Sequence, residues 1–217
     1  MRLLRYFRSA ALALFTSALL VSGSAAEAHP HIWVTSTSEL VYAADGSVTG
    51  VRHAWTFDDM FSRHALLGIE TKGAYTREEL QPLAQINIEM LKEHAYFTSL
   101  KVTEKLTFEA PIDYFLDYTD GRLTLHFTLP LKTPVKSKTF LLEIVDPSYF
   151  IDFQMAKDHP AKLVGAPASC EAWLGRPMGD DRDRKMAQGA SEDSFKEGGA
   201  NVSIGLLFEN KIMVECR

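Results

Sequence analysis

Two histidines at the start of the predicted mature chain could bind a metal ion. His29 and His31 flank Pro30, directly after a segment that we interpret as a secretory signal peptide. Cleavage after Ala28 would give His29 an α-amino group, so this residue could offer an amine and an imidazole nitrogen, and His31 a second ring. Pro30 has no amide hydrogen, which excludes a chelate of successive deprotonated amides. Further ligands must therefore come from elsewhere in the fold.

The signal peptide is predicted over residues 1–28. Three arginines precede an uncharged run from Ser9 to Val21, and the small residues Ala26 and Ala28 form the cleavage motif. Cleavage after Ala26 is the alternative, and it would leave two residues in front of His29 and remove the amine from the site. Export to the periplasm is expected in both cases.

Composition narrows the class of protein. The chain has 217 residues, with 23 Lys and Arg against 28 Asp and Glu, a formal charge of −5. Removing residues 1–28 takes away three arginines and one glutamate, so the charge becomes −7. This acidic balance argues against nucleic-acid binding. No later apolar run is long enough to span a bilayer, so we expect one periplasmic domain over residues 29–217 without stable membrane insertion.

Cys170 and Cys216 are the two cysteines of the chain. In a chain exported to an oxidising compartment, an even pair of cysteines favours a disulfide. A metal-binding or redox pair is the alternative. The wide separation and the lack of a Cys-x-x-Cys motif make the disulfide the favoured interpretation.

The hydrophobic pattern predicts an α+β fold, a mostly antiparallel, sandwich-like β domain with one helical insert at about 76–97. Thr76 and Glu79 form a capping box at the start of that helix. Residues 175–200 are charged and glycine-bearing, which predicts a mobile loop. Alternation and β-branched residues predict strands at 31–42, 47–58, 98–108, 113–118, 122–129, 139–146, 149–155 and 202–216.

His53 and Asp58 are the candidates that would complete the metal site. Both lie on the second predicted strand, and pairing Tyr42 with Ser47 across the turn would place His31 opposite Asp58. Imidazole and carboxylate groups are ligands that zinc, nickel or copper accept. The alternative is structural: Asp58 would cap the segment that follows it, and His53 would be a half-buried strand residue.

Other polar motifs are interpreted as structural. Residues 68–79 resemble a calcium loop with Gly73 and Glu79 in place, but Lys72 occupies a position that needs an oxygen ligand. We therefore expect a structural turn there. Nucleophile-elbow, nucleotide-binding and His-Glu-x-x-His motifs do not occur in the sequence, so nothing specifies an enzyme. Structural roles are also predicted for the solitary histidines His94, His126 and His159.

Five motifs stand out along the chain: His29–Trp33, Val51–Asp58, Asp113-Tyr114, Gly121–Leu125 and Asp146–Phe150. Together they resemble the periplasmic family catalogued as domain of unknown function 1007. The resemblance runs from His29 to about Cys170 and again over the closing strand at 208–216. It implies a periplasmic component of a transport system associated with nickel, cobalt or zinc. Many relatives carry an aspartate-rich loop before the helix, where this chain has 70–73 without aspartate.

These observations predict a periplasmic protein that binds a divalent transition metal, namely zinc, nickel, cobalt or copper. The predicted ligands are His29, His31, His53 and Asp58, and the predicted partner is a membrane metal transporter or exporter. A non-metal adaptor module of a transport complex is the alternative. A copper enzyme with an amino-terminal histidine brace is a third possibility, and we expect no catalytic activity.

Overall fold

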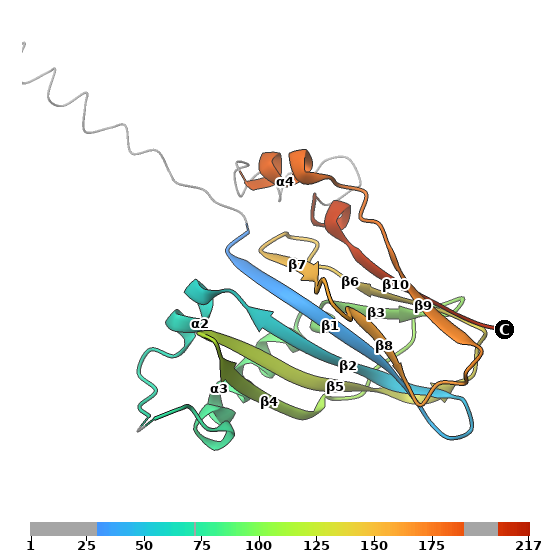
Figure 1. Cartoon of the computed structure of the whole chain (residues 1–217), viewed down its shortest axis with the longest axis horizontal. Coiled ribbons are helices and arrows are strands. Elements are labelled where there is room, and N and C mark those ends of the chain that lie inside the picture. Colours follow the sequence, from blue (N-terminus) through green and yellow to red (C-terminus); the bar gives the residue numbers. More distant parts are fainter. Residues whose placement is uncertain (1–29, 72, 189–203) are drawn as a thin grey trace, which may run out of the picture.

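In the part of the chain that the structure describes, two β-sheets share one hydrophobic core (Figure 1). The computed structural model describes residues 30–71, 73–188 and 204–217. The larger sheet has the order β4 (Ile112–Thr119), β5 (Arg122–Val135), β2 (Val48–Phe57), β1 (Ile32–Tyr42) and β7 (Ile151–Met155), with β8 (Ala161–Val164) also paired to β1. The smaller sheet has the order β3 (Thr98–Lys101), β6 (Thr139–Ile144), β10 (Asn210–Cys216) and β9 (Cys170–Gly175).

Strand direction confirms the predicted fold class. Within the described residues β7 and β8 run parallel to β1, and the other strand pairs are antiparallel. A mostly antiparallel sheet can leave one face to solvent, which explains the alternating sequence of its strands. The protein is therefore an α+β protein whose larger part is β.

Period-two alternation builds the core. Every second residue of β5 from Leu123 to Leu131 is buried, and the residues between them, such as His126, are partly exposed. The smaller sheet adds Leu142 and Ile212 to the same core. Burying one side chain of this size contributes about 2 kcal/mol, so the shared core holds the two sheets together.

The β1–β2 hairpin has a different register from the predicted one. Tyr42 pairs with Val48, one residue beyond the expected partner, and a bulge between Val41 and Tyr42 shifts the register again. As a result Val34 pairs with Phe57. The prediction that His31 lies opposite Asp58 is therefore wrong by two residues. A longer turn and a bulge caused the error, and neither is visible in the alternation alone.

The predicted helix exists but ends early. Helix α3 (Arg77–Lys92) begins at the predicted capping box, in which the Thr76 side chain accepts from the Glu79 amide and the Glu79 side chain accepts from the Thr76 amide. The short 3-10 turn η1 (Ala95–Phe97) follows, and all three of its residues have positive φ. α3 lies against β4 (Figure 1). A second helix, α2 (Asp59–Ala65), was not predicted.

The segment predicted as a mobile loop is partly helical. Within 175–200, helix α4 (Asp181–Gln188) is formed, and residues 189–203 lie outside the described part of the chain. Helix α4 contacts residues that are distant in the sequence. Arg184 forms an ion pair with the buried Asp152 of β7, and Ala187 joins a small apolar cluster. That cluster also includes Tyr149 and Phe208, the last residue of the 3-10 turn η2 (Ile204–Phe208). The charged local composition could not indicate these contacts.

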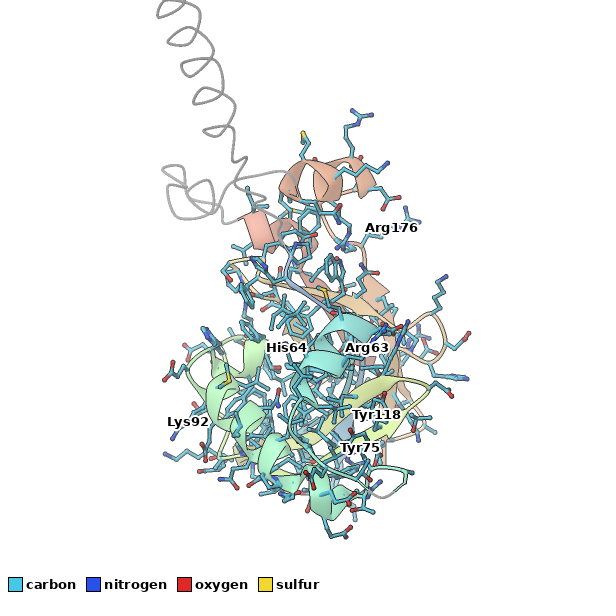
Figure 2. The ribbon with its side chains drawn as sticks, turned by 90° about the vertical axis from the view of Figure 1, so that its left-hand side faces the viewer. Arg63, His64, Tyr75, Lys92, Tyr118 and Arg176 are labelled. Atoms are coloured by element: carbon cyan, nitrogen blue, oxygen red, sulfur yellow. A yellow bond between two sulfur atoms is a disulfide. The ribbon has the colours of Figure 1, made fainter. Side chains whose placement is uncertain are left out.

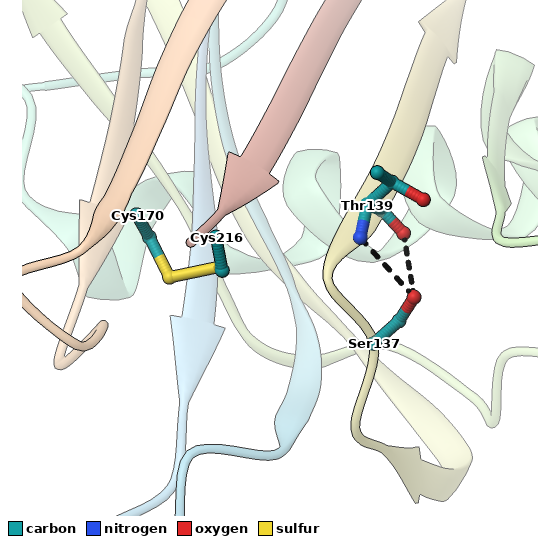
Figure 3. The surroundings of a disulfide bond; sticks show 4 residues. All are labelled: Ser137, Thr139, Cys170 and Cys216. Carbon is teal, nitrogen blue, oxygen red and sulfur yellow. Dashed lines mark hydrogen bonds between the residues drawn. A yellow bond between two sulfur atoms is a disulfide. The ribbon is translucent and has the colours of Figure 1, made fainter.

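The predicted disulfide is confirmed. Cys170 and Cys216 are directly paired residues of β9 and β10 and are linked by a disulfide (Figure 3). Nearby, the Ser137 hydroxyl donates to the Thr139 carbonyl at 2.9 Å and accepts from the Thr139 amide at 3.2 Å, which fixes the chain entering β6. A disulfide of this kind is typical of exported proteins. None of the helices in the described residues is long and apolar enough to cross a membrane.

Candidate functional site

The described residues form a wide apolar groove. It has a volume of about 740 Å³ and opens between α3, η1, the adjoining ends of β1 and β2, and the segment 146–151. Val34, Trp55 and Phe57 line it from the core face of the larger sheet. The volume lies in the range of ligand-binding pockets, about 300–1,000 Å³, and such pockets are usually lined by apolar and aromatic side chains.

Helix α3 forms one wall because it carries two apolar stripes. Leu80, Ala84 and Ile88 are buried in the core. Ile86 and Met90 line the groove and remain 52% and 67% exposed. A single amphipathic helix needs only the first stripe to dock on its sheet. The second stripe therefore leaves apolar surface exposed, a feature that typically marks interaction sites.

The segment 146–151 forms the opposite wall and is held by one buried carboxylate. Asp146 Oδ1 accepts from the Ser148 amide at 2.9 Å and from the Ser148 hydroxyl at 2.7 Å, and Oδ2 accepts from the Ile151 amide at 2.9 Å. These bonds fix the turn that presents Phe150, which is 45% exposed at the groove. The motif 146–150 thus shapes the wall of the groove.

The charge at the groove is acidic. Its charged lining residues are Glu89, Glu93 and Asp146, and none of the described lining residues is a lysine or arginine. Glu89 and Glu93 are exposed on α3, and the Gln85 amide nitrogen donates to Glu89 at 2.7 Å. Figure 2 shows this side of the molecule, with Lys92 on the side of α3 that faces away from α2. The groove therefore combines an apolar interior with a negatively charged rim.

His53, a predicted metal ligand, is a buried core residue. It is 1% exposed and packs against Trp55 and Phe127, at ring-centroid distances of 5.4 Å and 5.1 Å. Its Nδ1 lies 2.8 Å from the Ser38 hydroxyl and its Nε2 lies 3.2 Å from the Thr98 hydroxyl. Both ring nitrogens are therefore engaged within the core.

The hydrogen bonds also assign the tautomer of His53. The Thr98 hydroxyl donates its one hydrogen to the Tyr96 carbonyl at 2.7 Å, so it must accept from Nε2–H of His53. Nδ1 then accepts from the Ser38 hydroxyl. Burial lowers the pKa of His53 from 6.5 to about 3, because a charged ring would lose its hydration. The ring is neutral at physiological pH.

Asp58, another predicted ligand, caps a helix. Its Oδ1 accepts from the amides of Met60 and Phe61 at 2.8 Å and 2.9 Å, and its Oδ2 accepts from the Trp33 amide at 2.9 Å. Asp58 is thus the N-cap residue of α2 and also links α2 to β1. This confirms the capping role that we weighed against metal binding.

His31 lies beside Phe150, apart from His53. It is exposed at the start of β1, its ring centroid lies 4.7 Å from that of Phe150, and its amide donates to the Phe150 carbonyl at 2.9 Å. His53 pairs with Ser38, seven residues along β1, which is about 23 Å at the usual rise per residue. His29 lies outside the described residues. Within the described part of the chain, no group of three or more His, Cys, Asp or Glu side chains could hold a metal ion.

The remaining polar motifs have structural roles or lie at the groove. Glu79 is the last residue of the calcium-like segment 68–79, and its carboxylate accepts a hydrogen bond from the Thr76 amide in the helix cap. His126 stacks on Phe115 at 4.5 Å, and its Nε2 lies 3.4 Å from the Asp117 carboxylate. His94 lines the groove and stacks on Phe97 at 5.0 Å, a position that sequence reasoning missed.

The described residues form a disulfide-bonded, two-sheet α+β protein with an open apolar groove. The chain belongs to the family described as "Protein of unknown function (DUF1007)", whose model matches residues 13–216. It is similar to an uncharacterized protein of Haemophilus influenzae, with 25% identity over 195 residues that cover 87% of this chain and 91% of that protein. It is also similar to the "Uncharacterized 15.5 kDa protein in trpE 3'region" of Spirochaeta aurantia, with 32% identity over 97 residues that cover 44% of this chain and 69% of that protein.

Proposed function

We propose that this protein is a periplasmic binding protein that serves a membrane transport system and holds an apolar partner in the groove. The observation that carries this proposal is the exposed apolar surface of Ile86, Met90 and Phe150 around a cleft of about 740 Å³. These side chains are about half exposed, so burying the remainder would contribute about 1 kcal/mol each, which a bound partner would recover. The disulfide supports export to an oxidising compartment.

A binding role fits the groove better than a catalytic one. Its interior is mostly hydrocarbon, and the buried carboxylate in its lining, Asp146, already accepts three hydrogen bonds. A carboxylate used as a general base needs to reach a substrate proton, whereas this one is committed to holding the turn. We therefore propose that the protein recognises and presents a partner without transforming it.

A neutral apolar dye tests this proposal. The fluorescence of N-phenyl-1-naphthylamine rises when it enters an apolar site, and we expect saturable binding to the wild-type protein. Met90→Glu should weaken dye binding by about tenfold or more, because it places a charge in the apolar cleft. Met178→Glu is the matched control, since Met178 is 69% exposed and lies outside the groove lining. Equal dye affinity in both variants would contradict a binding role for the groove.

Transition-metal binding at the amino terminus is a second proposal. The supporting observation is that His31 is exposed at the start of β1, with its ring centroid 4.7 Å from that of Phe150. If cleavage leaves His29 as the first residue, the two histidines could bind zinc, nickel, cobalt or copper for transfer to a membrane transporter. His53 and Asp58 do not fit a ligand role in this geometry, because their nitrogen and oxygen atoms bond within the fold.

Calorimetric titration with zinc, nickel and copper tests the metal proposal. Replacing both His29 and His31 with alanine should abolish tight binding while the unfolding transition stays nearly unchanged. His126→Ala is the control histidine, and it should keep the metal affinity of the wild type. Unchanged affinity in the double variant would remove the metal proposal and leave the groove as the functional surface.

A further inference from the structure

We propose that the groove binds an amphipathic helix of a partner protein whose apolar face is flanked by lysines or arginines. This inference rests on the proposed binding function and names the chemistry of the partner. Three properties of the groove carry it: its dimensions, the nature of its walls and the sign of its charge.

The dimensions fit one face of a short helix. The α3 wall runs from Leu83 to Leu91, which corresponds to about 12 Å, or about two helical turns, and Glu93 and His94 extend it past the end of the helix. A cavity of about 150 Å³ accommodates one benzene ring, so a groove of about 740 Å³ has room for about five apolar groups of that size. Helices that bind in grooves insert residues at i, i+3, i+4 and i+7, which is a similar number of groups.

The walls favour a helix over an extended segment. α3 and the core face of the larger sheet present side chains to the groove, such as Leu83, Met90 and Phe57. A bound strand would need backbone donors and acceptors along a sheet edge, whereas a helix satisfies its backbone hydrogen bonds internally. A helix can therefore enter this apolar cleft without leaving unpaired amides. Met90 adds an adaptable side chain of the kind common at peptide-binding surfaces.

The charge at the rim selects the flanking residues of the partner. Glu89 and Glu93 are exposed one turn apart on α3, and no lysine or arginine is present among the described lining residues. The whole chain also carries a net charge of −5. Basic residues beside the apolar face of a partner would therefore be attracted, and anionic headgroups on an acyl chain would be repelled.

The experiment compares two helical peptides of about 16 residues with the same leucine face, long enough to span the α3 wall of the groove. One peptide has lysines at both ends, and the other has glutamates. Fluorescence anisotropy with the full-length mature protein should give a dissociation constant at least about tenfold lower for the lysine peptide, the sum of several exposed charge contacts. The preference should shrink at about 1 M salt, where the Debye length is about 3 Å.

Charge reversal on the protein provides the matched test. Glu89→Lys with Glu93→Lys should weaken the lysine peptide about tenfold and strengthen the glutamate peptide. Glu104→Lys with Glu109→Lys changes the net charge equally at exposed positions outside the groove lining and should have little effect. Met90→Glu should weaken the glutamate peptide by at least about tenfold, because it removes the apolar contact.

The possible outcomes separate this inference from the proposed function. Equal affinity of the two peptides, with dye binding still lost in Met90→Glu, would overturn the charge inference and keep the groove function. Tighter binding of a fatty acid that displaces the lysine peptide would replace the helix with an acyl chain. Failure of both peptides and of the dye to bind would overturn the inference and the proposed function together.

Discussion

Acidification should destabilise this protein through His53, and the structure gives the size of the effect. Burial lowers the pKa of His53 from 6.5 to about 3. The unfolded chain therefore takes up a proton as the pH falls below about 6.5, while the folded core resists protonation until about pH 3. The stabilisation is fully present above about pH 6.5 and is lost progressively as the pH falls toward 3, at about 1.4 kcal/mol for each pH unit. The complete loss is about 5 kcal/mol.

Chemical denaturation at several pH values measures this effect. His53→Gln is the reference variant, because its amide can accept from Ser38 and donate to Thr98 but does not titrate. Other carboxylates and histidines titrate in both proteins, so the difference in free energy of unfolding isolates His53. Between about pH 7.5 and pH 4.5 the wild type should lose about 3 kcal/mol more than the variant. A difference that stays constant across this range would refute the assignment of His53 as a neutral core residue.

Three further predictions concern the contacts that hold the outer elements. Arg184→Met should leave the buried Asp152 carboxylate without its ion-pair partner, and we expect a loss of about 3 kcal/mol in a urea-unfolding experiment; a loss below about 1 kcal/mol would show that the pair contributes little. Asp146→Ala should remove three hydrogen bonds from the groove wall and lower dye affinity, and dye affinity equal to the wild type would show that the turn holds itself without them. Replacing Cys170 and Cys216 with serine should cost about 4 kcal/mol by loop entropy, and an unchanged urea midpoint would show that the disulfide adds no stability.

The alternation of apolar residues predicted most of the β framework but missed β8 and β9. The alternation of apolar and polar residues predicted β5, and the capping box predicted the first residue of α3. Both signals are local, because the residues that form each pattern lie within a few positions of one another in the sequence. Cys170 and Cys216 were also paired correctly, because two cysteines in an exported chain allow one intramolecular disulfide.

The site could not be predicted, because it depends on contacts across the fold. His53 occurs in a polar sequence that suggested a ligand, yet its neighbours in space are Ser38 and Thr98. The groove combines α3 with a turn about 60 residues later in the chain, so no local pattern places them together. The one available signal was Ile86 and Met90, two apolar residues four positions apart on α3 that do not belong to its buried stripe.

The starting point of β1 determines how this protein should be handled in the laboratory. Ile32 lines the groove and the His31 amide bonds to the Phe150 carbonyl, so the polypeptide enters the fold at the mouth of the cleft. An affinity tag attached ahead of these residues would lie next to the surface that we propose for binding. It could obstruct a partner or bind metal in place of the protein. The carboxyl terminus follows Cys216 at the opposite end of the molecule (Figure 1). Immobilisation through that end would leave the cleft open to solvent.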